Sequence, residues 1–249
     1  MIRKILHKIY LFVGRLLTNI RLCFWRLRDK IKKPTENTVL FVAHPDDDSL
    51  FFHEFIKEHN PYVVLLTTGW SLRRYPCFKK VMKYYGVKYR AYNLNSRDKR
   101  VHLLEKYVSE MLTLLNPQIC ATHNSEGEYG HEMHVGVHNV VRKLVNCKLL
   151  VPVSDSDIVN FPLSDDIVKE KTMIFNKFYT TEIFVLEQYG KWVEKEMVKL
   201  LTTEKRRCKK SVGSVKYSRI DFKLVSFNTS KSQSWYAHTS TSRKNFTLT

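Results

Sequence analysis

The sequence predicts an α/β fold in which a mostly parallel sheet carries helices on both faces and an amphipathic helix comes before it. Three observations lead to this prediction. From Thr38 to about residue 200, short apolar runs alternate with helical patterns. A chain of 249 residues is long enough for one domain with a sizeable core plus appendages. Residues 1–33 show a separate pattern, which is apolar at helical spacing and rich in basic side chains.

Residues 1–33 form the first predicted element, a basic amphipathic helix. Its apolar positions are Ile2, Ile5, Leu6, Ile9, Phe12, Val13, Leu16, Leu17, Ile20, Phe24, Leu27 and Ile31. Ten basic residues stand against Asp29 alone, which gives this segment a net charge of +9. Its longest stretch without Lys or Arg runs only from Ile9 to Gly14, so it is not expected to span a membrane. We expect it to lie on an anionic membrane surface; the alternative is packing on the next domain or on a partner.

Residues 38–200 form the predicted α/β domain, which follows a linker at Pro34–Asn37. The expected strands are 38–43, 62–68, 87–93, 118–122 and 148–153. The expected helices are 48–59, 74–85, 99–116, 131–146 and 165–200. Repeated strand–helix–strand units form a Rossmann-like parallel sheet, and right-handed crossovers place all strand carboxyl ends along one edge. We therefore expect His44, Thr67–Gly69 and His123 to gather at the edge where ligands bind in such folds.

Residues 201–249 form a basic and polar C-terminal extension. The cluster Lys205–Lys210 has two interpretations, a nucleic-acid or nuclear-localisation patch and a solvated helix end. The alternating stretch Val215–Phe227 predicts a hairpin or an edge strand.

Charge and cysteine content narrow the partners and the compartment. A net charge of +18 and a pI near 9.7 favour anionic partners, such as nucleic acid, anionic lipid or a phosphate-bearing substrate. The alternative is a basic surface that only keeps the protein soluble. Five scattered cysteines without a CxxC pair argue against a disulfide framework. We therefore expect a cytoplasmic protein, attached to the cytoplasmic face of a membrane if its first helix binds lipid.

Two short segments contain the residues best suited to catalysis. Ala43–Asp48 follows the first predicted strand, and Gly127–His134 leads into a later helix. Together they supply three histidines and neighbouring carboxylates, and three protein ligands with one open position are typical of hydrolytic zinc sites. Adjacent aspartates at a strand-to-helix turn can point in different directions, so one can bind metal while the other takes a proton from water. His131 and His134 share a helix face, and the groups needed for amide hydrolysis are all present.

These two segments resemble the PIG-L or LmbE-like family of zinc-dependent de-N-acetylases. The family's hallmarks are AHPDD(E) at a strand end and a later HxxH, and the resemblance covers roughly residues 38–200. Val64–Gly69 resembles the family's second strand with its loop, and Lys83–Val87 resembles its passage from helix to strand. The family cleaves the acetamide of N-acetylglucosamine units in glycolipids, small glycosides and some antibiotic precursors.

The resemblance implies a zinc cofactor held by His44, Asp47 and His134. Asp46 would be the general base, and His131 would stabilise the oxyanion or assist proton transfer. Iron suits similar ligands, so the pattern does not choose between the two metals.

The chain also departs from the family pattern. Asp48 stands where glutamate is usual, and Cys77 stands where the family's Arg-x-x-Glu pair has its glutamate, after Arg73 and Arg74. The family's late His-x-Ser-Gln stretch is missing downstream of Lys171. These departures bear on the substrate and not on the metal ligands.

Five residues are the further candidates for substrate contact. Arg73 and Arg74 follow the second strand, and Tyr179 is a candidate oxyanion donor in place of the missing histidine. Glu126 and Glu128 are candidates for contact with sugar hydroxyls; a plain loop role is the alternative.

Three functions remain open from the sequence. The leading hypothesis is a metal-dependent deacetylase acting on an N-acetylglucosamine-type sugar that is lipid-linked or phosphate-bearing. The second is a soluble deacetylase that tailors a small glycoside or a secondary metabolite. The third is a non-catalytic nucleic-acid-binding or scaffold protein on the same fold. The intact ligand pattern and the lack of a recognised nucleic-acid module in the sequence disfavour the third, so nucleic acid is not an expected partner.

Overall fold

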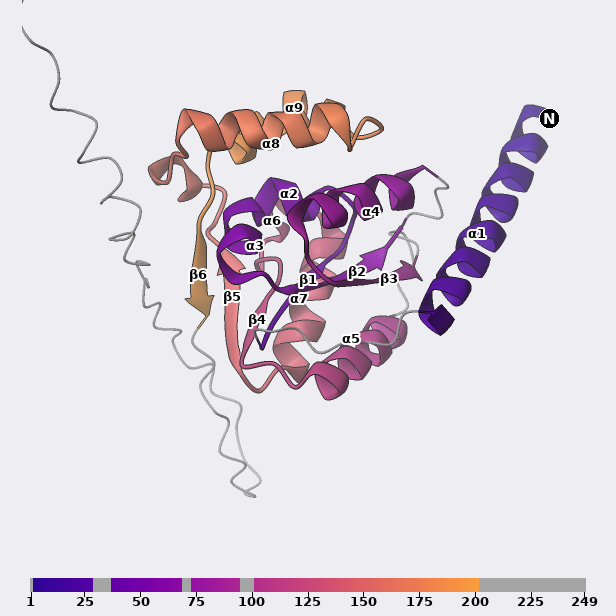
Figure 1. The fold of residues 1–249 in the computed structure, drawn as a ribbon, viewed down its shortest axis with the longest axis horizontal. Coiled ribbons are helices and arrows are strands. Elements are labelled where there is room, and N and C mark those ends of the chain that lie inside the picture. The colour runs from indigo at the N-terminus through magenta and orange to yellow at the C-terminus, as the bar shows by residue number, and fades with distance from the viewer. Residues whose placement is uncertain (1, 29–36, 69–72, 95–100, 202–249) are drawn as a thin grey trace, which may run out of the picture.

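The computed structural model describes residues 2–28, 37–68, 73–94 and 101–201, and it confirms the predicted α/β class (Figure 1). Its sheet has the strand order β3-β2-β1-β4-β5-β6. Strands β1 to β5 are parallel, and β6 runs antiparallel to β5. The strands are β1 (Thr38–Val42), β2 (Tyr62–Thr67), β3 (Tyr89–Leu94), β4 (Ile119–Ala121), β5 (Lys148–Pro152) and β6 (Val198–Leu201).

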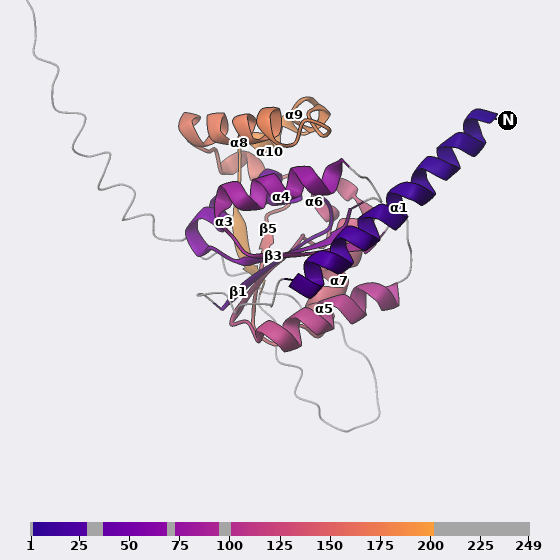
Figure 2. The same ribbon diagram turned by 45° about the vertical axis from the view of Figure 1, so that its right-hand side comes forward.

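Helices cover both faces of the sheet (Figure 2). They are α1 (Ile2–Arg28), α2 (Asp47–Phe51), α3 (His53–His59), α4 (Arg74–Tyr85), α5 (Val101–Leu115), α6 (Gly127–Gly130), α7 (Glu132–Leu144), a 3-10 turn (Ile158–Asn160), α8 (Asp165–Lys177), α9 (Phe184–Gln188) and α10 (Gly190–Val193). Strand β1 is buried throughout and serves both layers. Val39 and Phe41 belong to the core under α5 and α7, while Leu40 and Val42 belong to the core under α2–α4 and α8. This two-sided burial explains why the strands read as continuous apolar runs.

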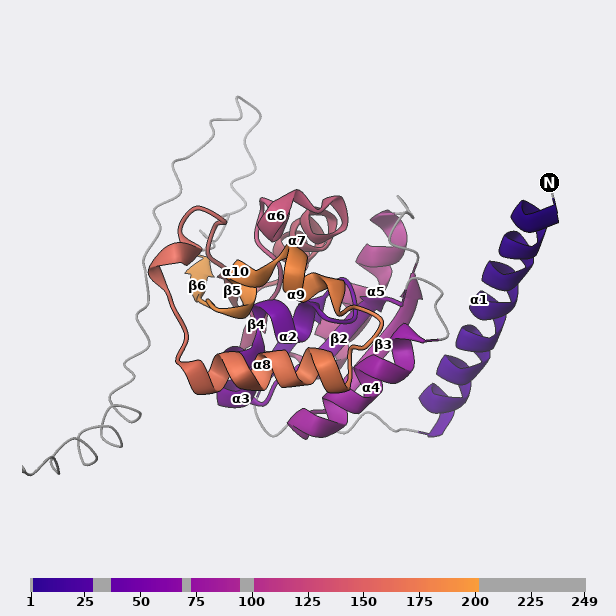
Figure 3. The ribbon, with the colours of Figure 1, turned by 90° about the horizontal axis from the view of Figure 1, so that it is seen from above.

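The sheet brings two distant segments together at its carboxyl edge (Figure 3). The chain leaves β1 towards β2 on one side and returns as β4 on the other side. Such a reversal opens a crevice beside the strand ends, where ligands bind in α/β sheets. At this point the Ala43 N–H donates a hydrogen bond of 3.0 Å to His123 Nε2. The segments that follow β1 and β4 are therefore held side by side.

The prediction of one helix over 165–200 is wrong. The helix ends at Lys177, two short helices follow, and Val198–Leu201 is a strand. This strand pairs Leu200 and Leu201 with Leu150 and Leu149 of β5. Its apolar side chains fit a helical pattern as well as a strand pattern. The segment forms a strand because it can pair with the otherwise open edge of β5.

One other predicted helix is interrupted. The segment 48–59 breaks at Phe52, whose φ of −136° is not helical. The break suits the side chain of Glu196, which accepts the backbone N–H groups of His53, Glu54 and Phe55 at 2.8–3.4 Å. The predicted helix 131–146 is confirmed as the single helix α7, with His131 as its N-cap, and the short helix α6 ends just before it.

The predicted N-terminal helix is present as α1, and it lies beside the edge strand β3 (Figure 1). Asn93 Nδ2 donates a hydrogen bond of 2.9 Å to Asn19 Oδ1. In the described part of the chain, no helix is both long and apolar enough to cross a membrane. The basic cluster Lys205–Lys210 and the predicted strand at Val215–Phe227 fall outside the described residues.

Candidate metal centre

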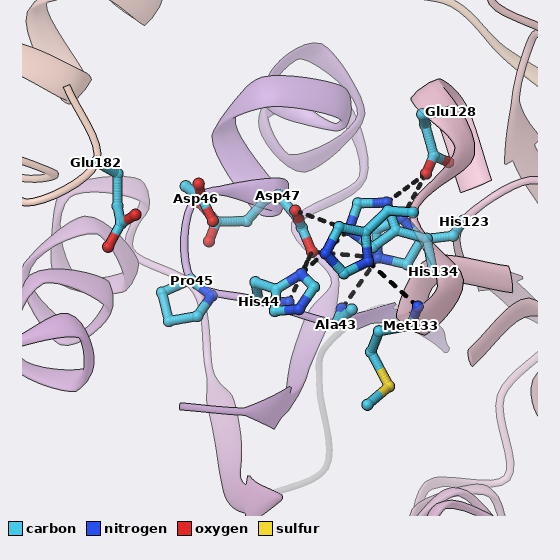
Figure 4. Close-up of polar contacts among 12 residues, drawn as sticks. Ala43, His44, Pro45, Asp46, Asp47, His123, Glu128, Met133, His134 and Glu182 are labelled. Carbon is cyan, nitrogen blue, oxygen red and sulfur yellow. Dashed lines mark hydrogen bonds and ion pairs between the residues drawn. The ribbon is translucent and has the colours of Figure 1, made fainter. Parts of the chain in front are cut away.

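The turn after β1 separates two neighbouring carboxylates. The chain leaves β1 at Val42 and enters α2 at Asp47. Asp46 adopts a φ of 103°, in a region that residues with a side chain rarely occupy. The backbone N–H of His44 donates to Asp47 Oδ2 at 2.6 Å, which fixes the Asp47 side chain across the turn. Figure 4 shows the result: the Asp47 carboxylate points at the histidines, and the Asp46 carboxylate points away from them.

Three side chains converge at this point, His44, Asp47 and His134, and both oxygens of the Asp47 carboxylate take part. The His44 Nδ1 atom lies 3.1 Å from His134 Nε2 and 3.3 Å from Asp47 Oδ2. The His134 Nε2 atom lies 3.4 Å from Asp47 Oδ1. A tetrahedral zinc ion with bonds of about 2.0–2.1 Å needs ligand atoms about 3.3–3.4 Å apart. The spacing and the donor types of these three residues therefore fit a divalent metal.

A buried carboxylate holds His134 in the orientation that ligation requires. Glu128 Oε2 accepts from His134 Nδ1 at 2.7 Å and from His123 Nδ1 at 3.0 Å, and its Oε1 accepts the Asn124 N–H at 2.8 Å. A proton on Nδ1 leaves the Nε2 lone pair of His134 facing Asp47 and His44. Metal-binding histidines commonly have such a carboxylate partner behind them.

The electrostatics of the centre favour a cation. Burial lowers the pKa of His44 to about 4, so this imidazole is neutral at neutral pH. Burial also opposes charge on His134, but the carboxylates of Asp47 and Glu128 outweigh it and raise the pKa of His134 to about 10. Burial likewise opposes charge on Glu128, yet the imidazoles of His123 and His134 hold its pKa at about 2. The two carboxylates thus stabilise positive charge between them, which a divalent cation can supply as well as a proton.

His123 joins the centre, although sequence reasoning assigned it only a place at the strand edge. It is fully buried, its ring stacks on that of His134 with centroids 3.9 Å apart, and its Nε2 lies 3.3 Å from Asp47 Oδ2. Asp47, His123 and His134 therefore form a second triplet that could hold a metal. Because the Ala43 N–H and Glu128 already occupy both ring nitrogens of His123, we favour the triplet with His44.

His131 lies at the open side of the same cluster. It is half-buried, and its ring centroid is 4.6 Å from those of both His44 and His134. Its Nδ1 accepts the Met133 N–H at 3.2 Å, as the N-cap of α7. This bond fixes the ring and leaves Nε2 as the nitrogen that can meet a substrate. His44, His131 and His134 also form a triplet with metal-binding spacing.

Of the two candidate arginines, Arg74 reaches the centre. Its Nη2 donates to Pro45 O at 3.1 Å and to Asp46 Oδ1 at 3.3 Å. Its Nε forms an ion pair of 2.6 Å with Glu182 Oε1, a partner that sequence reasoning missed. Burial raises the pKa of Asp46 well above its usual range, and the Arg74 charge opposes that rise. Arg73 is exposed at the start of α4.

Two candidates for substrate contact lie elsewhere than expected. Tyr179 is fully buried and donates to Asp48 Oδ2 at 2.6 Å, so its hydroxyl is used inside the core and is not an oxyanion donor. Glu128 is buried behind His134 and His123, so it orients imidazoles and does not face a sugar. Glu126 is exposed on the loop, which is compatible with either of its two expected roles.

The chain matches no protein-family model and no curated protein. Among solved structures it is similar to the conserved protein TT1542 from Thermus thermophilus, with 13% identity over 63% of this chain and 85% of that one and a TM-score of 0.45. The A40926 pseudoaglycone deacetylase Dbv21 gives 13% identity, coverage of 62% and 85%, and a TM-score of 0.46. The 4-carboxy-2-hydroxymuconate hydratase GalB from Pseudomonas putida KT2440 gives 9% identity, coverage of 71% and 99%, and a TM-score of 0.48. These values are too low to assign a family, so function is inferred from the chain's own residues.

Proposed function

We propose that this protein is a metal-dependent amide hydrolase that removes the acetyl group from an N-acetylglucosamine-type sugar. One observation carries the proposal: the ring nitrogens of His44 and His134 lie 3.1 Å apart and each lies 3.3–3.4 Å from an oxygen of Asp47, while a further carboxylate, Asp46, points away from them. Hydrolytic metal sites typically combine a metal ion with an adjacent general base. The sugar follows from the resemblance of the two motif segments, and zinc is the metal we propose.

The roles of the residues follow from their positions. A divalent metal held by His44, Asp47 and His134 would supply a Lewis acid for the amide carbonyl and would lower the pKa of water. Asp46 would take a proton from the attacking water and pass it to the leaving amine. Burial raises the pKa of Asp46, which suits a group that must hold a proton for part of the cycle, and Arg74 keeps its carboxylate in place.

His131 acts on the substrate oxygen. Burial lowers the pKa of its imidazole, with His134 adding to the effect. The N-cap bond to the Met133 N–H holds its ring over the centre, and its Nε2 can stabilise charge that develops on the carbonyl oxygen.

Whether the sugar is lipid-linked or part of a small soluble glycoside is a second question. Residues 34–201 contain 21 basic and 21 acidic side chains, so the proposed catalytic region has no net charge of its own. A phosphate group on the substrate is therefore not required by the charge of this region. A soluble, uncharged glycoside remains the alternative substrate.

The experiment is acetate release from a panel of N-acetylated sugars and glycolipids, combined with metal analysis of the wild type and its variants. We expect the wild type to bind one divalent metal and to release acetate from at least one compound. Asp46→Asn keeps the metal and loses most activity, and His134→Ala loses the metal. Asp157→Asn, at an exposed position of the chain, is the matched control and should change neither quantity.

Two results would contradict the proposal. One is a fully metal-loaded wild type that releases no acetate from any compound of the panel. The other is an unchanged metal content in His134→Ala, which would move the centre elsewhere. If Asp46→Asn loses its metal while Asp47→Asn keeps it, the roles of the two aspartates are reversed.

A further inference from the structure

The outer face of α1 exposes a continuous apolar stripe. The exposed fractions of nine large apolar side chains on this helix are 41–67%. They are Ile5, Leu6, Ile9, Tyr10, Phe12, Val13, Leu16, Leu17 and Ile20. The spacing of three and four residues places them on one side of the helix. We call these nine residues the α1 stripe.

The helix contacts the rest of the protein at β3, next to the margin of the stripe. Gly14 is buried, and at about 100° per residue it lies well away from the centre of the stripe. The Asn19–Asn93 hydrogen bond joins this helix to β3. In two of the views α1 stands apart from the helices that cover the sheet (Figures 1 and 3). The nine stripe side chains are therefore exposed and outside the core, while α1 itself contacts β3.

The stripe differs from ordinary exposed apolar residues. In the rest of the described structure, exposed large apolar side chains are spread singly or in pairs over several elements: Tyr84, Val101, Leu114, Val159, Ile183 and Phe184. Single exposed apolar residues need no explanation, whereas a contiguous patch marks a surface that something covers.

The distribution of charge along the chain indicates which kind of partner covers the α1 stripe. Residues 1–33 contain ten basic residues and one acidic residue, and residues 202–249 contain eleven and two, while residues 34–201 are balanced. The whole excess of +18 therefore belongs to the two ends of the chain. We propose that α1 lies on an anionic lipid bilayer, with the stripe in the interface, and that the positive charge of the chain favours this anionic surface.

Other occupants fit these observations less well. A second copy of the chain would bring two segments of +9 together, and residues 202–249 are also basic, so both would repel α1. Nucleic acid is bound through basic and aromatic side chains, and seven of the nine stripe residues are aliphatic.

The test uses the full chain and flotation with vesicles. We expect the wild type to float with vesicles of phosphatidylglycerol and phosphatidylcholine and to bind pure phosphatidylcholine more weakly. High salt should release it only in part, since apolar burial is not screened. The variant Leu6→Gln/Phe12→Gln/Leu16→Gln should bind at least about tenfold less. The matched control Val101→Gln/Leu114→Gln/Val159→Gln removes equally exposed apolar residues from other elements and should bind like the wild type.

A second variant distinguishes a loss of lipid binding from a loss of folding. Lys8 is exposed on α1, and Lys8→Glu should weaken binding to anionic vesicles roughly tenfold without affecting binding to phosphatidylcholine. Four outcomes would overturn the proposal: a wild type that ignores vesicles, a stripe variant that floats like the wild type, self-association that the stripe variant abolishes, or RNA binding that outcompetes vesicles. None of these measurements depends on catalysis, so the proposal can fail without the proposed hydrolase failing.

Discussion

Two carboxylates at the candidate centre sit on strained backbone. Asp46 and Glu128 both have positive φ values, 103° and 59°, in a region that costs a non-glycine residue about 1–3 kcal/mol. In each case the unusual backbone sets a side chain: Asp46 is turned away from Asp47, and Glu128 is placed behind two imidazoles. Strain of this kind persists where the surrounding contacts hold the residue in place, which is typical of functional sites.

Glu128→Gln tests the second of these positions. The amide can accept one imidazole N–H but carries no charge, so the Nδ1 proton of His134 is held less firmly. We expect the affinity for zinc to fall about 10–100-fold while the protein stays folded. Competition against a chromophoric chelator measures the affinity. Glu126→Gln, two residues away and exposed, is the control, and equal affinities in the two variants would show that Glu128 does not position the ligand.

Sequence reasoning could find the residues of the centre only where a motif contained them. His44, Asp47 and His134 stand in two short segments, and the expectation that adjacent aspartates point apart needs only a strand-to-helix turn. No motif predicts that Glu182 contacts the centre or that the Glu128 side chain points inward. Glu182 pairs with Arg74 across 108 positions of sequence, and the direction of Glu128 depends on one unusual φ value.

At the level of elements, Glu196 and Lys171 hold together the helices behind the centre. The Lys171 ammonium is fully buried and donates to Leu50 O, to Trp192 O and to Glu196 Oε2 at 2.8–3.1 Å. Glu196 in turn accepts the first N–H groups of α3. The pair therefore joins α2, α3, α8 and α10 through charge-assisted hydrogen bonds.

Removing one member of this pair should be costly. Glu196→Ala leaves the Lys171 charge buried without its partner and the first N–H groups of α3 without their acceptor, so we expect a loss of about 3–5 kcal/mol of unfolding free energy. Urea unfolding measures it, with Glu194→Ala at an exposed position as the control. The double variant Glu196→Leu/Lys171→Met should lose clearly less than the sum of the single changes. Additive losses would mean that the two residues act independently.

The sequence predicts best those elements whose apolar pattern follows directly from burial of the element in the core. All five parallel strands are confirmed, and β1 and β2, which are buried throughout, have the clearest apolar pattern. The errors lie where tertiary partners decide. Val198–Leu201 becomes a strand because β5 offers it an edge, and the helix break at Phe52 coincides with a carboxylate that arrives from Glu196, more than 140 positions away.

At the scale of the whole molecule, stability should depend on pH through His53. Burial lowers the pKa of His53 from 6.5 to about 4, so between these values the unfolded chain binds a proton that the folded chain rejects. Stability therefore rises with pH through this window and falls as the pH drops through it, by up to about 3 kcal/mol. Urea unfolding at about pH 7.5 and about pH 5 measures the loss. His53→Asn should reduce it, and the exposed control His102→Asn should not; an equal loss in all three proteins contradicts the assignment.

The distribution of charge also changes how the high pI is interpreted. The sequence predicted an anionic partner for the whole chain, but residues 34–201 are electrically balanced. The excess charge therefore says nothing about the substrate and concerns only the segments on either side of the catalytic region. A basic chain can thus contain a site whose own chemistry is governed by carboxylates.

The contacts of the centre join parts of the chain that are 80 and 90 positions apart, at Ala43–His123 and His44–His134. An unfolded chain cannot offer these groups together, so a metal that binds them binds the native state alone. Metal binding is then thermodynamically coupled to global unfolding: at a free concentration about one thousand times Kd, it adds about 4 kcal/mol to stability. A chelator should lower the melting temperature of the wild type and leave that of His134→Ala unchanged, as calorimetry would show. Metal supply in the cell would then determine how long the chain survives proteolysis, as well as whether it is active.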